Sequence, residues 1–141
     1  MSTETNKRII VGGFEEGMNQ GNLAYYDQYA APTYVNHNMP VPGTGPEAMK
    51  MAVGMFKTAF PDFHVTIEEV LAEGDRVSTR GYFTGTHLGV FNGIPATGKS
   101  VRAGYIDIWR LENGKVAENW VQMDMLGLLQ QLGVIPAPQP A

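Results

Sequence analysis

The sequence predicts an α+β fold in which one curved, mainly antiparallel sheet wraps over helices from the first half of the chain. Two observations lead to this prediction. Apolar residues recur at helical spacing in the first half, whereas the second half alternates between apolar and polar residues, as strands do. The chain of 141 residues is 43% hydrophobic and only 17% charged, which suits a single globular domain over residues 1–141.

Three helices are expected before the sheet. In the first, Ile10, Phe14 and Met18 share one face, although nearby glycines each weaken a helix by about 1 kcal/mol. Asn22 can cap the second helix, and Pro46 suits the first turn of the third. The three helices are expected over about residues 5–19, 23–29 and 46–60, and a short fourth helix over 125–132 is ended by Gly133.

Five extended segments are expected, and three local signals mark bends and turns in them. The alternation slips at Glu69, as a β-bulge would cause, and the Gly74-Asp75 pair turns the chain. Asn113-Gly114 is a strong hairpin signal between two long strands. The strands are expected over about residues 33–37, 63–73, 76–87, 100–111 and 116–123.

Charge and cysteine content exclude several classes of function. The formal net charge is −4 and the pI about 5.3, with Lys and Arg scattered, so neither nucleic acid nor a membrane is an expected partner. Cysteine is absent, which favours a reducing compartment. The N-terminal residues contain no apolar run long enough for a signal peptide, and residues 134–141 form a Pro-rich extended tail. We therefore expect a cytoplasmic location.

Two features that invite a cofactor interpretation are weak. The segment 93–100 completes the pattern Gly-x-x-x-x-Gly-Lys-Ser, but a phosphate-binding loop must open a helix, and Ser100 begins an alternating strand. His37, His64 and His87 lie far apart in the sequence and provide no short-spaced pair of metal ligands. We therefore expect neither a metal nor a cofactor.

The return strand of the hairpin carries the main catalytic candidate. Glu118, Trp120, Gln122 and Asp124 share one face, so a carboxylate projects beside an indole and an amide. If that face lines a cavity, desolvation raises the pKa of Asp124 toward a range in which one group can both accept and return a proton. The alternative is that Asp124 only caps the helix that begins at Met125.

Histidines and tyrosines are the remaining polar candidates. His37 and His87 can each lie at the mouth of a pocket, and each can equally be a structural histidine bonded to backbone. His64 alternates out of phase with its apolar neighbours and is expected at the surface. Tyrosines crowd the second helix and its exit, where core packing is the ordinary role and one hydroxyl can contact a ligand.

Seven strings, spread over nearly the whole chain, resemble the SnoaL-like polyketide cyclases of the nuclear transport factor 2-like superfamily. They are YVNH at 34–37, FPD at 60–62, AEGDRV at 72–77, GTHLG at 85–89, GIPATGK at 93–99, GKVAENW at 114–120 and DMLGLLQQLG at 124–133. The resemblance implies a conical barrel, in which one strongly curved mixed, mainly antiparallel sheet wraps over three N-terminal helices and encloses a deep apolar cavity.

The resemblance also implies a chemistry. Well-described members close a ring in an aromatic polyketide ester by intramolecular aldol condensation, using a carboxylate that abstracts a proton and neither metal nor cofactor. Asp124 matches the family's acid/base aspartate, and His37 and His87 match recurrent family positions. The expected substrate is small and hydrophobic or aromatic, and the expected assembly is a homodimer or homotetramer. The residues expected to bind the substrate are Trp120, Tyr26, Tyr34, Gln122 and Tyr105.

Other functions remain open within the same fold. Related conical barrels catalyse dehydration, isomerisation or epoxide hydrolysis. Epoxide hydrolysis needs a carboxylate clustered with an arginine, such as Asp107 or Asp124 with Arg80 or Arg102. A non-catalytic module that binds small molecules and forms dimers is a third possibility, in which Asp124 titrates as an ordinary helix cap.

Overall fold

The computed structural model describes residues 2–39 and 41–136, and the expected tail residues 137–141 lie outside this part. The helices are α1 (Thr3–Gly12), the π-helix η1 (Gly13–Asn19), α2 (Ala24–Tyr29), α3 (Gly45–Ala59) and α4 (Met125–Gln131). The strands are β1 (Ala30–Asn36), β2 (His64–Glu73), β3 (Arg76–Thr86), β4 (Ser100–Glu112) and β5 (Lys115–Met123). The predicted α+β order of elements is confirmed.

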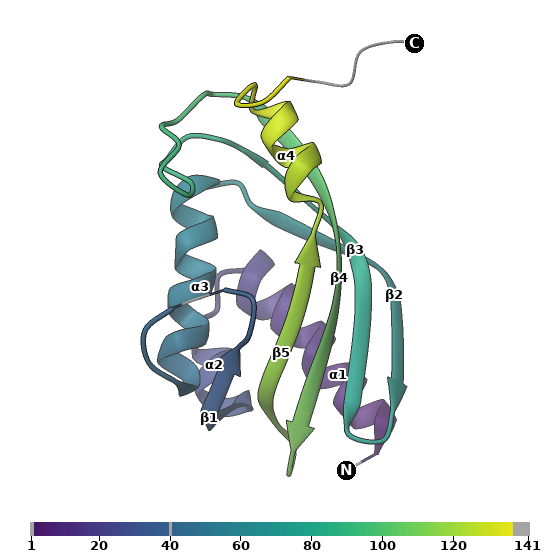
Figure 1. Cartoon of the computed structure of the whole chain (residues 1–141). Helices are drawn as coiled ribbons and strands as arrows, with labels where there is room; N and C mark the ends of the chain where they lie inside the picture. The colour runs from purple at the N-terminus through teal and green to yellow at the C-terminus, as the bar shows by residue number, and fades with distance from the viewer. Residues whose placement is uncertain (1, 40, 137–141) are drawn as a thin grey trace.

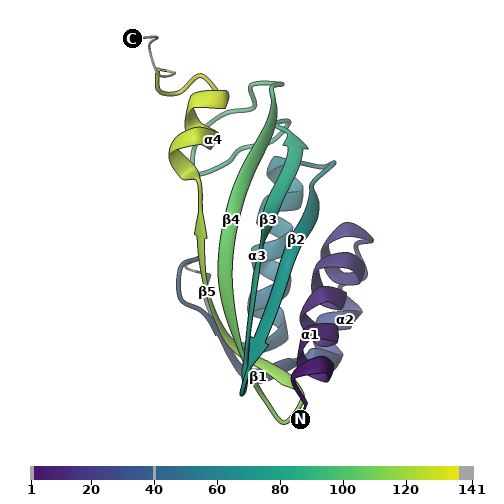
Figure 2. The same ribbon diagram turned by 90° about the vertical axis from the view of Figure 1, so that its right-hand side faces the viewer.

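The five strands form one mixed sheet in the order β1-β5-β4-β3-β2. Strand β1 runs parallel to β5, and every other neighbouring pair is antiparallel. The sheet curls without closing, because β1 and β2 remain separate edges, so the expected conical barrel is an open, curled sheet. Helices α1, α2 and α3 lie on one side of this sheet, and α4 sits at one end (Figures 1 and 2).

Two predicted distortions of the strands are confirmed. The hairpin between β4 and β5 turns at Asn113 and Gly114, whose φ angles of 49° and 75° are those that a tight hairpin turn requires. The β2–β3 register shifts between Ile67 and Glu69, where the alternation in the sequence slips. The shift bends β2 and helps the sheet to curl over the helices.

The first helix begins at Thr3, earlier than predicted, and winds more loosely from Gly13 onward as the π-helix η1. Two tyrosines of the α2 segment stabilise this region, since the hydroxyl of Tyr25 donates to the Ile9 carbonyl at 2.7 Å and that of Tyr26 to the Gly13 carbonyl at 2.9 Å. The glycines of this stretch leave the space that the two phenol rings occupy. The loose winding places Phe14 and Met18 against the sheet.

The segment after η1 departs from the prediction in two details. Helix α2 begins at Ala24, and the side chain of Asn22 makes no cap; only its backbone carbonyl accepts, from the Tyr25 amide. Strand β1 begins at Ala30, before the predicted start at residue 33, and so includes Pro32. Proline is tolerated there because β1 is an edge strand of the sheet.

Substitution of Gly17 by alanine should destabilise the protein, because a methyl group there would overlap the hydroxyl and ring of the buried Tyr26. We expect the free energy of unfolding to fall by about 1–3 kcal/mol. The matched control is Gly54→Ala in α3, where the added methyl group meets open space and should raise stability by up to about 1 kcal/mol. Urea denaturation of both variants checks this; equal effects would contradict the packing argument.

Candidate functional site

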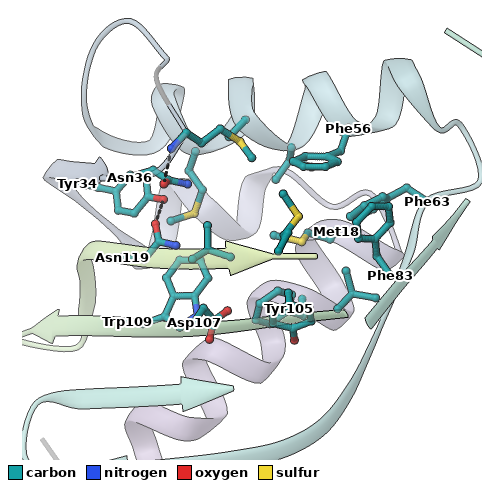
Figure 3. A pocket seen from close by; sticks show the side chains of 18 residues that line it. Met18, Tyr34, Asn36, Phe56, Phe63, Phe83, Tyr105, Asp107, Trp109 and Asn119 are labelled. Carbon is teal, nitrogen blue, oxygen red and sulfur yellow. Dashed lines mark hydrogen bonds between the residues drawn. The ribbon is translucent and has the colours of Figure 1, made fainter. Parts of the chain in front are cut away.

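A cavity of about 90 Å³ lies between the concave face of the sheet and the helices. Its wall is largely apolar and includes the side chains of Phe14, Met18 and Phe56. In Figure 3, Phe56 projects from α3 toward the same space as Tyr105 and Trp109 from the sheet. The polar groups in the wall belong to Tyr34, Asn36, Tyr105, Asp107, Trp109 and Asn119.

Asp107 is the only carboxylate among the described residues that line this cavity. The inward-facing residues of β4 alternate with exposed ones, and Asp107 falls in the inward phase between Tyr105 and Trp109. Only 3% of its surface is exposed. The strand therefore carries a carboxylate into a face that is otherwise apolar or aromatic, where an ionised group needs compensating hydrogen bonds.

Thr79, directly opposite on β3, supplies those hydrogen bonds. Its backbone amide donates to Asp107 Oδ1 at 2.9 Å, and its hydroxyl donates to the same oxygen at 2.7 Å. The Tyr105 hydroxyl lies 3.2 Å from Thr79 Oγ1. Both bonds end on Oδ1, and no well-formed hydrogen bond reaches Oδ2 from the described part of the chain, although the Trp109 indole lies close to the carboxylate.

Burial raises the pKa of Asp107 to about 6, outweighing the donors of Thr79 and the nearby indole of Trp109, which lower it. A carboxyl group in this range can be ionised near neutral pH and still return a proton readily. Burial also raises the pKa of Tyr105 to about 12, which keeps its hydroxyl protonated. The arrangement suits acid/base chemistry on an apolar ligand.

A second polar group lies on the neighbouring strands β5 and β1. The hydroxyl of Tyr34 donates to Oδ1 of Asn119 at 2.7 Å, and both residues are almost fully buried. Nearby, Oδ1 of Asn36 accepts from the backbone amides of Asn38 and Met39, both at 3.0 Å. These bonds fix the start of the loop after β1 and place Met39 in the cavity wall.

Asp124 lies outside this cavity. Its carboxylate is exposed and accepts a hydrogen bond from the Gly127 amide at 2.9 Å, as the N-cap of α4. It borders only an open hollow on the surface, together with Gln122 and Arg80. The structure thus has the capping geometry that the sequence left as the alternative, and the burial expected for a catalytic carboxylate at this position is absent.

The expected face of β5 is also reversed. Asn119, Val121 and Met123 face the cavity, whereas Trp120 and Gln122 lie on the other side of the strand. Alternation shows which residues share a face but not which face is inside. Trp120 instead stacks on the imidazole of His37, with ring centres 4.9 Å apart.

Neither histidine candidate reaches the cavity. His37 is part of the outer surface, where Nε2 lies 2.7 Å from Glu118 Oε2. His87 is fully buried after β3, and its Nδ1 accepts from the Thr97 amide at 3.2 Å, which fastens the loop between β3 and β4. The expected surface position of His64 is confirmed.

Of the five expected substrate-binding residues, the cavity contains Tyr34 and Tyr105. Tyr26 lines a smaller hollow beside α1 and α2. The sequence reasoning missed Trp109 and Asn119 and named Asp107 only as a possible partner of an arginine. The alternation of residues along β4 could have identified Asp107, because it is the one charged residue on the inward face of this strand.

No arginine lines the cavity within the described residues. Arg80 pairs on the outer surface with Glu69 at 2.7 Å, and Arg102 covers the ring of Tyr82 at 3.6 Å. The carboxylate–arginine pair expected for epoxide hydrolysis is therefore not formed there.

In residues 2–39 and 41–136, no cluster of three potential metal ligands occurs, and no helix has the length and apolar character needed to cross a membrane.

Comparisons with known proteins agree with the geometry. The SnoaL-like polyketide cyclase family matches residues 8–132. The chain is 34% identical over 115 residues to aklanonic acid methyl ester cyclase DnrD of Streptomyces peucetius, covering 80% of this chain and 77% of that protein. It is 29% identical over 119 residues to nogalonic acid methyl ester cyclase of Streptomyces nogalater, covering 82% and 88%.

Among solved structures, TsrD from Streptomyces laurentii superposes with a TM-score of 0.87 and 30% identity, over 96% of this chain and 99% of that one. The family match spans almost every element from α1 to α4 and includes the strands that build the cavity. The chain therefore belongs to the SnoaL-like polyketide cyclase family, as the strings in its sequence predicted.

Proposed function

We propose that this protein is a cofactor-independent polyketide cyclase whose acid/base group is Asp107 rather than Asp124. The observation that carries the proposal is the single buried carboxylate of an apolar cavity, with one oxygen held by Thr79 and a pKa raised to about 6 by burial. Asp124 is exposed to solvent, which would leave a carbanion formed beside it open to protonation by water.

The proposed reaction begins when Oδ2 of Asp107 removes a proton from a carbon that lies between carbonyl groups of the substrate. The electron pair of that C–H bond forms an enolate, whose carbon attacks a second carbonyl of the same molecule. A carbon–carbon bond forms and the attacked oxygen becomes an alkoxide. Asp107, now protonated, returns its proton to that alkoxide, so the enzyme leaves the cycle unchanged.

The wall of the cavity suits a hydrophobic or aromatic substrate that reshapes it on binding. A volume of about 90 Å³ is below the roughly 300–1,000 Å³ of ordinary ligand pockets. Four methionines in the wall, Met18, Met39, Met49 and Met123, are unbranched and flexible enough to move aside. Met39 and Met123, with Phe56, also border a wider groove on the surface, which we infer to be the entrance.

We further infer a homodimer formed through the outer face of the sheet. Helices cover the inner face, whereas Ile106 and Ile108 of β4 point outward with 60% and 41% of their surface exposed. Apolar side chains gathered on an uncovered sheet face are typical of an interface between subunits. A tetramer is the other assembly that this family resemblance suggested.

The absence of cysteine supports a cytoplasmic setting, which fractionation of cells would test.

Asp107→Asn should lower kcat by about 10²–10⁴-fold, because the variant retains the shape of the cavity and loses the base. The assay uses aklanonic and nogalonic acid methyl esters, the compounds in the names of its relatives. In the wild type, kcat/KM should fall as the pH drops through about 6, where Asp107 becomes protonated. The matched control, Asp124→Asn, should retain activity; the opposite result would make Asp124 the base.

The same two variants should differ in the pH dependence of their stability. The folded-state pKa of Asp107, about 6, exceeds the ordinary value of 3.8, so ionisation of the buried group costs about 3 kcal/mol of stability above pH 6. That cost disappears as the pH falls toward 4. Asp107→Asn should therefore be more stable than wild type at pH 8 by up to about 3 kcal/mol, and no more stable at pH 4.

Asn is as good a helix cap as Asp, so Asp124→Asn should change stability by less than about 0.5 kcal/mol at both pH values. Guanidinium denaturation at pH 8 and pH 4 measures both variants. A gain for Asp107→Asn that is the same at both pH values would exclude burial of an ionised carboxylate as its cause.

Ile106→Glu should convert the proposed dimer into monomers, since it places a further carboxylate in the interface beside Arg80, which already pairs with Glu68 and Glu69. Light scattering during gel filtration measures the mass. Met51→Glu, an equally apolar and exposed position on α3, is the control that should leave the mass unchanged. A wild-type monomer, or a dimer that both variants preserve, would contradict an interface on this face.

A further inference from the structure

The indole of Trp109 brings a hydrogen-bond donor to the cavity wall, beside the Asp107 carboxylate. Its Nε1 is buried and has no hydrogen-bond partner, although Trp N–H groups usually find one when buried. The ring is held by the β4 backbone and by edge-on packing against Phe14, with ring centres 5.8 Å apart. The donor is therefore fixed in place, near enough to Asp107 to lower the pKa of that carboxyl but without a well-formed hydrogen bond of its own.

A second donor lies beside it on the neighbouring strand. Asn119 is directly opposite Trp109 in the β4–β5 ladder, so the two side chains emerge next to each other on the cavity face. The Tyr34 hydroxyl donates to Oδ1 of Asn119, so the amide nitrogen is the group of this cavity-lining side chain that can donate to a ligand. Figure 3 shows the two side chains close together above Asp107.

We propose that Trp109, with Asn119 beside it, binds the carbonyl oxygen of the substrate next to the carbon that Asp107 deprotonates. Asp107 and Trp109 are two residues apart on the same face of β4, so a base and a donor lie side by side. As the proton leaves, negative charge moves to that oxygen. A fixed N–H group in a water-poor cavity stabilises the charge more than it stabilises the neutral ketone, which accelerates the step.

This inference rests on the proposed function for its catalytic meaning, but the donor itself can be tested without turnover. The probe is acetophenone, an aryl ketone, and its isostere α-methylstyrene replaces the oxygen with a methylene group. The chain has two tryptophans, so Trp120→Phe assigns the two indole N–H signals in a proton–nitrogen NMR spectrum. Acetophenone should move the Trp109 signal downfield, and α-methylstyrene should not.

Trp109→Phe removes the donor and keeps an aromatic ring, and Trp120→Phe on the outer face is its matched control. The affinity for acetophenone should fall about 3–10-fold in Trp109→Phe, with the affinity for α-methylstyrene unchanged. On the esters, kcat should fall by about 10²-fold, and the inflection in kcat/KM should move to a pH above 6, because the indole helps to lower the pKa of Asp107. Trp120→Phe should match the wild type in all three measurements.

Two results would overturn the inference. One is a Trp109 indole signal that responds equally to both probes in the wild-type protein, a result that does not depend on the folding of Trp109→Phe. The other is a Trp109→Phe enzyme whose inflection moves to a different pH with an unchanged maximal rate, since Trp109 would then only adjust the ionisation of Asp107. Loss of the proposed function is recognised separately, by full activity in Asp107→Asn.

Discussion

The structure of the site depends on the hydrogen bonds between Thr79 and Asp107, which hold a carboxylate inside an apolar face. Without them, burial of a charge in the middle of β4 would cost several kcal/mol and the strand would be unfavourable in this register. With both donors directed at Oδ1, the group remains buried and its second oxygen is left for a ligand. The hydrogen bonds from Thr79, rather than burial alone, therefore allow position 107 to hold a carboxylate that a ligand can contact.

The remaining elements keep water away from that carboxylate. The curled sheet provides one wall, and η1 and α3 provide the other with aromatic and methionine side chains. Tyr25 and Tyr26 hold this helical segment in place through the backbone carbonyls of Ile9 in α1 and Gly13 in η1. Asn19, at the end of η1, exchanges two hydrogen bonds with the backbone of Val65 and so joins the helix to the sheet edge. The backbone of this wall is held by hydrogen bonds, whereas its methionine side chains can adapt to a ligand.

Much of the fold could be predicted because its signals are local. The Asn113-Gly114 turn, the bulge near Glu69 and the apolar stripe of α3 each depend on neighbouring residues. The site could not be predicted so well, because a strand has two faces and alternation does not say which is buried. Asp124 shares the outer face with Trp120. The charged residue inside is Asp107, which could be recognised only because the other residues on its face of β4 are uncharged. The family strings transferred the architecture more reliably than the position of a single proton acceptor.

The π-helical winding of η1 has a consequence for how such a scaffold diversifies. One inserted or deleted residue there would rotate the flanking helical side chains by about 100° relative to one another, while the sheet stayed intact. Phe14 and Met18 would then offer the chamber a different outline. Length changes in this one segment thus give evolution, or an engineer, a means of reshaping the interior that leaves the proposed proton-transfer residues on β4 undisturbed.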